Sequence, residues 1–273
     1  KNKKTILPKF YNTRVFFTTS HTQHTHAHLY YDSMCDRLDD VIGDAAENHV
    51  HKIVCIGTDV ASSKQSVDIA NHYEGVYAAV GVHPHDSNDV DSNYIKELEH
   101  LASSSKKVVS IGEIGIDHYR NLSPPDVQRK VMIEQMELAN SLNLPIIFHN
   151  RDADDEIFNV LKEHTFNRAL SHCFSSDIVF ANQLVDLNIL LSFSGNVTFK
   201  NSSNRSAAEN IGLDNFVLET DCPFLSPHPF RGKPNEPKRV YDIALYLSEL
   251  LGISIEEIAD ATSKNAMQFF NID

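Results

Sequence analysis

The 273-residue chain has few cysteines and no long hydrophobic run. No segment approaches the roughly 20 consecutive apolar residues that a transmembrane helix needs, so we expect no membrane partner. The four cysteines form neither a C-x-x-C pair nor the dense pattern of a disulfide-stabilised domain. Their scatter favours a reducing compartment, and we expect a cytoplasmic protein, with nuclear, organellar or secreted locations as alternatives.

The chain also has few positively charged residues relative to negatively charged ones. The chain has 24 Lys and Arg against 37 Asp and Glu, which gives a net charge of −13. Proteins that bind a polyanion over a broad surface normally present a basic face, so this composition argues against such binding. A bound metal ion can reverse the sign of the charge locally. An acidic protein with a metal centre can therefore still bind a phosphate at one point.

The sequence shows no linker or compositional break that would divide it into two domains. Residues 1–20 differ from the rest, because they contain five basic residues and no acidic one. We predict a basic, poorly ordered N-terminal extension over 1–20, either a solvated tail or the remnant of a targeting segment. Residues 21–273 are then one domain, and nothing in them indicates an obligatory protein partner.

Short β-rich runs alternate with amphipathic segments along the whole chain. The runs lack a clean polar alternation, which is typical of strands covered on both faces. We predict strands at 52–57, 76–80, 108–111, 145–148, 169–171, 189–193 and 216–219. We predict helices near 62–73, 92–104, 124–142, 153–164, 177–187, 203–211, 236–251 and 254–270, with caps at Asp91 or Ser92 and at Ser123.

An eighth strand must precede residue 26, and it is the weakest of the set. The best apolar run there, Val15 to Phe17, lies several residues upstream, and the stretch from Thr18 to Gln23 is polar. Eight strand–helix repeats predict a parallel (β/α)8 TIM barrel. An open, doubly wound sheet is the alternative, but no glycine-rich loop follows the first strand.

Six potential metal ligands punctuate the chain, nearly every one at the point where an apolar run ends, which is where an α/β barrel places its chemistry. Imidazole and carboxylate groups are ligands for zinc, manganese or magnesium. Each residue also has an interpretation without metal. A lone H-x-H, as at His26 and His28, is weak evidence, and a histidine after a strand can be a hydrogen-bonded core residue. An Asp before Cys-Pro, as at Asp221, can cap a turn. A carboxylate flanked by glycines after a buried strand is costly to bury without a partner or a cation. The six are His26, His28, Glu113, His149, His172 and Asp221.

The order of short motifs around these residues resembles the TatD family of metal-dependent deoxyribonucleases, from residue 26 to about 271. The motifs are THAHL at 25–29, GVHPH at 81–85, GEIGIDHY at 112–119, PIIFHNRDA at 145–153, SHCFS at 171–175, SFSGN at 192–196, ETDCPFL at 219–225, RGKPNEP at 231–237 and NA at 265–266. The resemblance implies an amidohydrolase-like TIM barrel that binds two divalent ions (Mg, Mn or Zn) and hydrolyses phosphodiesters in DNA.

By the same resemblance, the six ligand-type residues take the family's metal-site roles. We expect Glu113 to bridge two ions, His26, His28 and Asp221 to hold one, and His149 and His172 to complete the other. Asp221 would also orient or deprotonate the attacking water. We expect DNA as substrate, cleaved from ends or single strands in the manner of a 3′–5′ exonuclease. We expect His83, His85, Arg151, Arg231 and Lys233 to contact substrate, and Asp117 and Tyr119 to support the ligands.

Two positions depart from the family's pattern. His24 stands where the family usually has Asp, which leaves the geometry around His26 open, and Ser176 stands where Gly is usual. Two other functions also stay open. One is a different metal-dependent hydrolase of the same barrel, acting on small phosphoesters or amides. The other is a catalytically inactive nucleic-acid-binding protein, which the complete set of ligand-type residues and the acidic charge disfavour.

Overall fold

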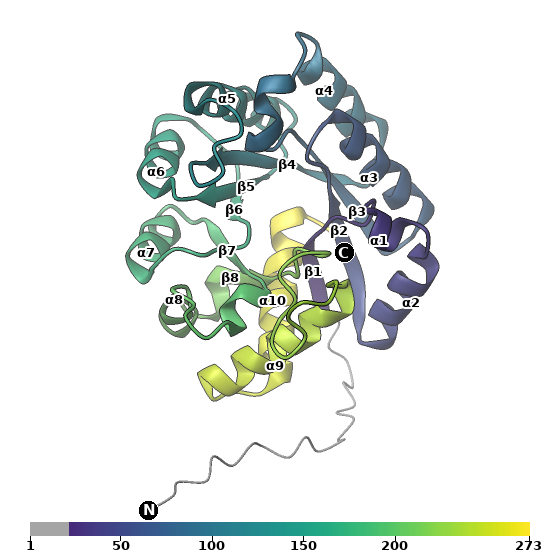
Figure 1. The fold of residues 1–273 in the computed structure, drawn as a ribbon, viewed down its shortest axis with the longest axis vertical. Helices are drawn as coiled ribbons and strands as arrows, with labels where there is room; N and C mark the ends of the chain where they lie inside the picture. Colours follow the sequence, from purple (N-terminus) through teal and green to yellow (C-terminus); the bar gives the residue numbers. More distant parts are fainter. Residues whose placement is uncertain (1–21) are drawn as a thin grey trace, which may run out of the picture.

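The computed structural model describes residues 22–273, and its centre is one sheet of eight parallel strands in sequence order. A bridge between Ala27 and Cys222 brings the two edges together into a nearly closed barrel (Figure 1). The (β/α)8 prediction is confirmed. The strands are β1 Thr22–Ala27, β2 Val50–Ile56, β3 Val76–Val80, β4 Val108–Asp117, β5 Ile146–Arg151, β6 Ala169–Ser171, β7 Leu190–Phe193 and β8 Phe216–Leu218.

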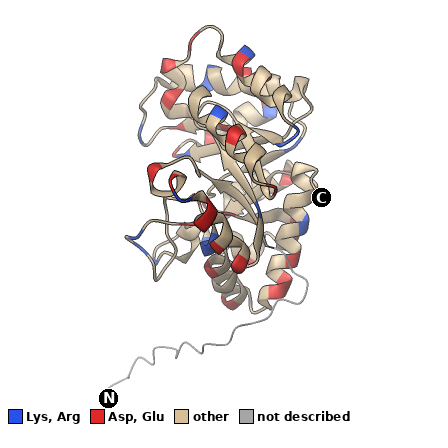
Figure 2. Cartoon of the chain, turned by 90° about the vertical axis from the view of Figure 1, so that its right-hand side faces the viewer, with Lys and Arg blue, Asp and Glu red and all other residues tan. Residues whose placement is uncertain are grey.

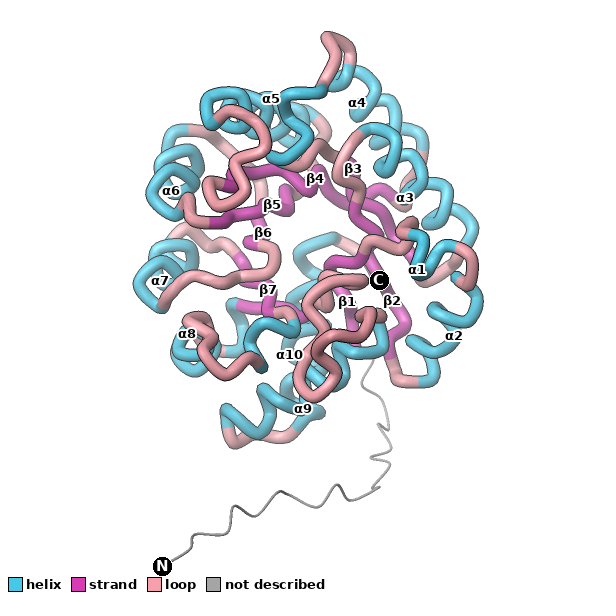
Figure 3. Tube along the Cα trace, in the orientation of Figure 1, coloured by secondary structure: helices cyan, strands magenta, loops and turns pink. Residues whose placement is uncertain are grey.

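Helices surround the barrel, with the strands inside them (Figure 3). They are α1 Asp32–Cys35, α2 Leu38–Glu47, α3 Val60–His72, α4 Tyr94–Ser104, α5 Pro125–Ser141, α6 Asp154–Glu163, α7 Ile178–Asp186, α8 Arg205–Asn210, α9 Val240–Leu251 and α10 Ile255–Phe270. Short 3₁₀ turns are η1 Pro84–Asp89, η2 Gly195–Thr198, η3 Leu213–Asn215 and η4 Pro237–Arg239. Capping boxes at Asp59 and Ser254 begin α3 and α10. Acidic residues lie on several of the outer helices (Figure 2).

Two apolar clusters hold the layers together. The larger lies between the outer faces of the strands and the helices, and it includes Cys55, Ala78 and Phe148. The smaller contains the alternate residues of the same strands, such as Ile56 and Ile147, together with Phe269 and Phe270 of α10. Because successive strand residues face opposite sides, the second cluster fills the barrel interior, and α10 closes it. The polar residues that could carry out chemistry lie at the opposite end of the barrel.

The first strand explains why its position was hard to predict. β1 has the sequence TQHTHA, and its residues 23–27 are all buried although most are polar. A strand whose inward residues pair with one another inside the barrel carries no hydrophobic signal. The run Val15 to Phe17 and the basic extension over 1–20 lie outside the described residues. In residues 22–273 no helix is long and apolar enough to cross a membrane.

Several predicted boundaries were wrong. β4 continues through Glu113 to Asp117 instead of ending at Ile111. The N-cap of α4 is Asn93, one or two residues after the predicted caps, and Asp91 accepts a hydrogen bond from the Asn93 N–H. The N-cap of α5 is Pro124 rather than Ser123, because the Ser123 hydroxyl is engaged with the loop after β3, donating to His85 O. α1 and α2 were not predicted.

Two buried glutamines of α5 hold the loops that lead into the site. The Gln135 side chain accepts from the Val82 N–H at 2.7 Å and donates to the Val82 carbonyl at 3.0 Å, next to His83. Gln128 accepts from the Asp117 N–H at 2.8 Å and donates to the Ser123 carbonyl at 2.6 Å. Each side-chain amide forms hydrogen bonds with backbone N–H and carbonyl groups that no neighbouring strand pairs. Helix α5 therefore fixes the backbone at the ends of β3 and β4.

We predict that Gln135→Leu lowers the free energy of unfolding by about 1–3 kcal/mol, the cost of leaving a buried backbone N–H and carbonyl unpaired. Leucine keeps most of the volume, so the loss reports the hydrogen bonds rather than a cavity. The measurement is urea denaturation beside Gln268→Leu, which changes an exposed glutamine of α10. Equal stability of the two variants would show that the amide does not hold the loop.

Candidate metal centre

Glu113 lies at the centre of a group of histidines at the carboxyl end of the barrel. It is 3% exposed and sits inside β4 between Gly112 and Gly115. A Cβ on Gly112 would be 2.8 Å from Ile147, and one on Gly115, where φ is +139°, would be 2.1 Å from the His149 carbonyl. The glycines therefore allow β5 to lie directly against the segment that carries the carboxylate.

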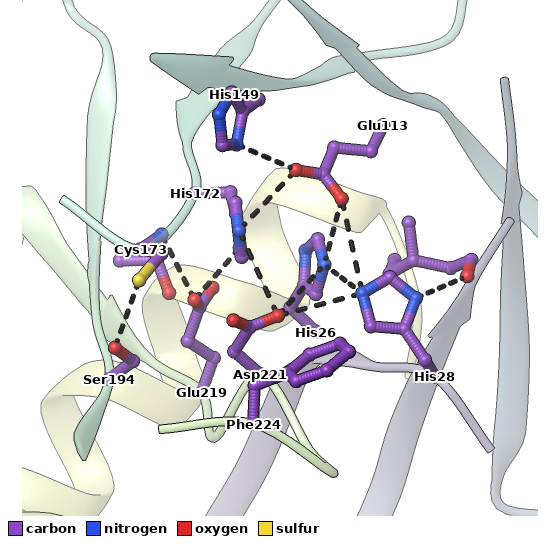
Figure 4. A network of polar contacts seen from close by, with 12 residues as sticks. His26, His28, Glu113, His149, His172, Cys173, Ser194, Glu219, Asp221 and Phe224 are labelled. Carbon is purple, nitrogen blue, oxygen red and sulfur yellow. Dashed lines mark hydrogen bonds and ion pairs between the residues drawn. The ribbon is translucent and has the colours of Figure 1, made fainter. Parts of the chain in front are cut away.

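The two oxygens of Glu113 face two different sets of imidazoles (Figure 4). Oε2 lies 3.3 Å from His26 Nε2 and 3.9 Å from His28 Nε2. Oε1 lies 3.1 Å from His149 Nδ1, 3.4 Å from His172 Nε2 and 3.5 Å from His83 Nε2. One carboxylate thus joins five histidine side chains from four different strands or the loops that follow them.

Asp221 completes the first of these sets. Its Oδ1 lies 3.5 Å from His28 Nε2, 3.8 Å from His26 Nε2 and 3.9 Å from His172 Nε2. It follows β8 by three residues, and its φ of +57° is a left-handed conformation that Asp tolerates better than most residues. This turn aims the carboxylate back over the barrel axis, toward the two histidines at the end of β1.

These separations fit a shared cation. Ligand atoms about 2.1 Å from one ion lie about 3–4 Å from each other. Within this range are the Glu113 and Asp221 contacts above and the 3.3 Å between the Nε2 atoms of His26 and His28. Two imidazole nitrogens aimed at each other in a buried place need a proton or a cation between them. The residues present fit divalent metal ions.

A second layer of carboxylates supports the histidines from behind. Glu219 Oε1 lies at ion-pair distance, 2.9 Å, from His172 Nδ1, although the two are not aligned for a hydrogen bond, and it accepts from the Cys173 N–H. Asp117 Oδ2 is within 3.1 Å of His149 Nε2 and 2.8 Å of His85 Nε2. Such partners fix which ring nitrogen faces the metal.

The backbone does the same for His28. Its Nδ1 donates to the Ile56 carbonyl at 2.9 Å, which leaves Nε2 for the centre. Tyr30 Oη lies 3.3 Å from the same Nδ1 and from Thr58 Oγ1, so the loop after β2 also positions this ring.

The electrostatics of the group favour ionised carboxylates. Burial alone would raise the pKa of Glu113, but the imidazoles of His172 and His83 hold it well below its usual value. Burial would likewise lower the pKa of His172, but Glu219 and Glu113 raise it to about 10. Burial and the neighbouring His172 lower the pKa of His26. A cation beside Glu113 would displace the His172 proton, because only neutral imidazole binds metal.

His24 holds the turn before Asp221 from inside the barrel. The Thr220 N–H donates to His24 Nε2 at 3.0 Å, and Thr220 Oγ1 lies 2.6 Å from the same nitrogen. Nε2 is therefore an acceptor and the ring carries its hydrogen on Nδ1. Burial lowers the pKa of His24 to about 3, so it is neutral. The departure from the family's aspartate leaves His26 at the centre and ties β1 to the Asp221 turn.

The other departure is also accommodated. The Ser176 hydroxyl donates to Asp154 Oδ1 at 2.7 Å, and the Asn150 amide donates to the same oxygen at 2.6 Å. Ser176 thus joins the loop after β6 to the start of α6.

The centre lies in a cavity of about 630 Å³ that opens at the carboxyl end of the strands. Of the residues predicted to contact substrate, His83, His85 and Arg151 line it. Arg231 and Lys233 are not among its lining residues, and the Arg231 guanidinium lies 3.9 Å over the Phe199 ring instead.

The two predicted supporting residues behave differently. Asp117 contacts both His85 and His149. Tyr119 is 61% exposed and its ring lies 3.9 Å under the Arg151 guanidinium, because the chain turns outward after β4 ends at Asp117. It does not support the ligands.

Sequence reasoning missed two groups of residues and gave His83 a different role. Glu219 carried a signal, since it is two residues before Asp221 in Glu-Thr-Asp and can face the same side. His83 was expected at the substrate, whereas its distance from Glu113 places it among the potential ligands. Arg120, Tyr31 and Phe224 line the cavity from loops, where no periodic pattern indicates direction.

The fold and the site together define a metal-dependent hydrolase built on a (β/α)8 barrel. Comparisons with known proteins give the family. The family described as TatD related DNase matches residues 24–271, and the chain belongs to this family.

Several bacterial proteins described as metal-dependent hydrolases are similar to this chain. The chain is 41% identical to the uncharacterised metal-dependent hydrolase YabD of Bacillus subtilis, over 91% of this chain and 98% of that protein. It is 35% identical to the uncharacterised metal-dependent hydrolase YcfH of Escherichia coli, over 91% and 95% of the two chains. The crystal structure of YjjV, a TatD homologue from Escherichia coli, superposes with a TM-score of 0.89 at 28% identity, over 92% of this chain and 98% of that one.

Proposed function

We propose that this protein is a deoxyribonuclease that hydrolyses phosphodiester bonds of DNA at ends or in single strands, in the manner of a 3′–5′ exonuclease. The observation that carries the proposal is Glu113, whose two oxygens face separate imidazole sets. A carboxylate shared in this way is suited to bridging two divalent ions. Two such ions would activate a water and stabilise the departing oxygen of a phosphodiester.

The residues of the chain have separate tasks in this reaction. His26 and His28 with Asp221 would hold one ion, and His149 and His172, joined by His83, the other. The Asp221 carboxylate faces the cavity and its pKa is lowered, since the hydrogen bond from His28 and the charges of the neighbouring histidines outweigh burial. An ionised carboxylate there can orient the attacking water and accept its proton.

Two features favour a nucleic acid end over other phosphoesters. Arg120 and Arg151 line the cavity, and an arginine can pair with a phosphate through two hydrogen bonds. The net charge of −13 opposes binding along a duplex, so the substrate has to reach the cavity as an end or a flexible strand. The family's description as TatD related DNase supports the same substrate.

A panel of labelled substrates tests the proposal. Single-stranded, double-stranded, abasic-site and closed circular DNA are incubated with magnesium, manganese or zinc, beside a small phosphodiester and an amide. We expect metal-dependent cleavage of single strands and ends, loss of cleavage in EDTA, and little action on closed circles. Turnover of only the small phosphodiester or the amide would contradict DNA as the substrate. Equal turnover with and without EDTA would refute metal dependence.

We predict that Asp221→Asn lowers kcat on a short single-stranded oligonucleotide by about 10²-fold or more, the usual worth of a general base. Asparagine keeps the shape and caps a turn nearly as well, so the thermal melt should stay close to that of the wild type. The loss should appear in kcat rather than KM, because the proton is accepted only during attack. Asp68→Asn, an exposed position on α3, is the control.

Near-normal kcat in Asp221→Asn with an intact melt would reduce Asp221 to a turn residue. If Asp221→Asn loses activity and its melting temperature also falls sharply, the loss could come from unfolding. Asp221→Glu then separates the two causes, because it keeps the charge and should retain more activity than the asparagine variant.

A further inference from the structure

Two aromatic side chains form one wall of the cavity beside the metal centre. Phe224 is 46% exposed and Tyr31 is 38% exposed, although both line the cavity. Their rings meet edge to face at 5.4 Å, and the centroids of Phe224 and Tyr31 are 6.2 and 5.8 Å from the His28 ring. Figure 4 shows the Phe224 ring next to Asp221 and His28. A flat apolar surface therefore adjoins the ligands.

The opposite wall is cationic. Arg120 follows β4 and Arg151 ends β5, whereas Tyr31 follows β1 and Phe224 follows β8. In a barrel with the strand order β1 to β8, the β4–β5 pair lies across from the adjoining β8 and β1 (Figure 1). The Glu113 carboxylate contacts His26 of β1 and His149 of β5, and so it adjoins both sides. Among residues 22–273, neither guanidinium forms an ion pair with a carboxylate.

Contacts within the protein hold the side chains or loops of both walls in position. The Arg151 guanidinium lies 3.9 Å over the Tyr119 ring, which limits where it can point. The Arg120 N–H donates to Asp117 Oδ1 at 2.7 Å, so the carboxylate that supports His149 also fixes the start of the Arg120 loop. Tyr31 packs against Tyr30 at 5.2 Å, which braces the aromatic wall from the side of β1.

An exposed aromatic pair and two unpaired arginines across one metal centre match the chemistry of a nucleotide chain. Bases stack on aromatic rings whatever their identity, and backbone phosphates follow cationic grooves. A small phosphoester or an amide would use neither wall fully. The asymmetry also sets a direction, because the base lies on one side of the hydrolysed bond and the remaining strand continues on the other.

We propose that Phe224, braced by Tyr31, is a stacking subsite for the base of the 3′-terminal nucleotide of a single strand. Arg120 and Arg151 bind the phosphates of the adjoining nucleotides on its 5′ side. This inference rests on the proposed deoxyribonuclease function and names the part of the substrate that each wall recognises.

The test of the aromatic wall compares two 5′-labelled oligonucleotides that differ only at the 3′-terminal nucleotide, which carries a normal base or a stable abasic sugar. The wild type should remove the base-bearing nucleotide with a kcat/KM about fivefold or more higher, as expected for one stacked base. Phe224→Leu should bring the ratio to within about twofold, while Phe224→Tyr, which keeps the ring, should retain most of it.

Val179→Ala is the matched control, because Val179 is 63% exposed on α7, outside the cavity. Its ratio should equal that of the wild type. Thermal melting of each variant separates loss of the subsite from loss of fold, and the ratio itself is insensitive to the amount of folded enzyme, since both substrates are measured with one preparation.

The cationic wall is tested by salt and length. For Arg120→Gln and Arg151→Gln, the slope of log(kcat/KM) against log[salt] on a ten-nucleotide strand should fall in magnitude by about 0.7 for each phosphate that the variant no longer neutralises. The difference between ten-nucleotide and dinucleotide substrates should shrink as well. Arg129→Gln, whose side chain pairs with Glu163 on the outer surface, should change neither quantity.

The outcomes are distinct. Cleavage by the wild type without preference for the terminal base, or an unchanged ratio in Phe224→Leu, overturns the stacking subsite and leaves the deoxyribonuclease function standing. An unchanged salt slope in both arginine variants overturns the phosphate wall. Absence of cleavage on any DNA substrate with any of the metals overturns the proposed function and, with it, both subsites.

Discussion

The burial of Glu113 is the constraint on which the rest of the site depends. A carboxylate that is 3% exposed loses most of its hydration, at a cost of several kcal/mol unless opposite charge surrounds it. Here the compensation comes from imidazoles on four different strands or the loops that follow them, so the charge requires the barrel to be closed around it. Asp117 and Glu219, which are 0% exposed, extend the same requirement outward, since each is buried against a histidine of the inner group.

The architecture separates stability from chemistry along the barrel axis. Phe269 and Phe270 of α10 close one end with apolar contacts, and the polar group occupies the other. Between them, buried polar side chains bind the loops to the frame, as Gln135 does for Val82 and His24 does for Thr220. These hydrogen bonds hold the site residues in place without adding charge to the centre, which keeps Glu113 and Asp221 available to cations and water.

Much of the fold could be predicted because it rests on hydrophobic burial. Strands β2 to β8 appear as apolar runs, and four of the six ligand-type residues stand next to such runs: Glu113, His149, His172 and Asp221. β1 could not be found in this way, since His24 and His26 are buried by pairing with polar groups far along the chain. The direction of loop side chains was equally hidden: Arg120 and Phe224 line the cavity, while Arg231 lies over Phe199. Loop direction is decided by tertiary packing, which leaves no period in the sequence.

The bridging role of Glu113 is tested most directly by a crystal structure of the manganese-loaded protein with anomalous difference maps. We expect two peaks about 3.5–4 Å apart, one on each side of Glu113. One peak would contact Oε2 of Glu113 with His26 and His28, and the other would contact Oε1 with His149. A single peak, or peaks that do not share the Glu113 carboxylate, would contradict the bridging role from which the proposed chemistry follows.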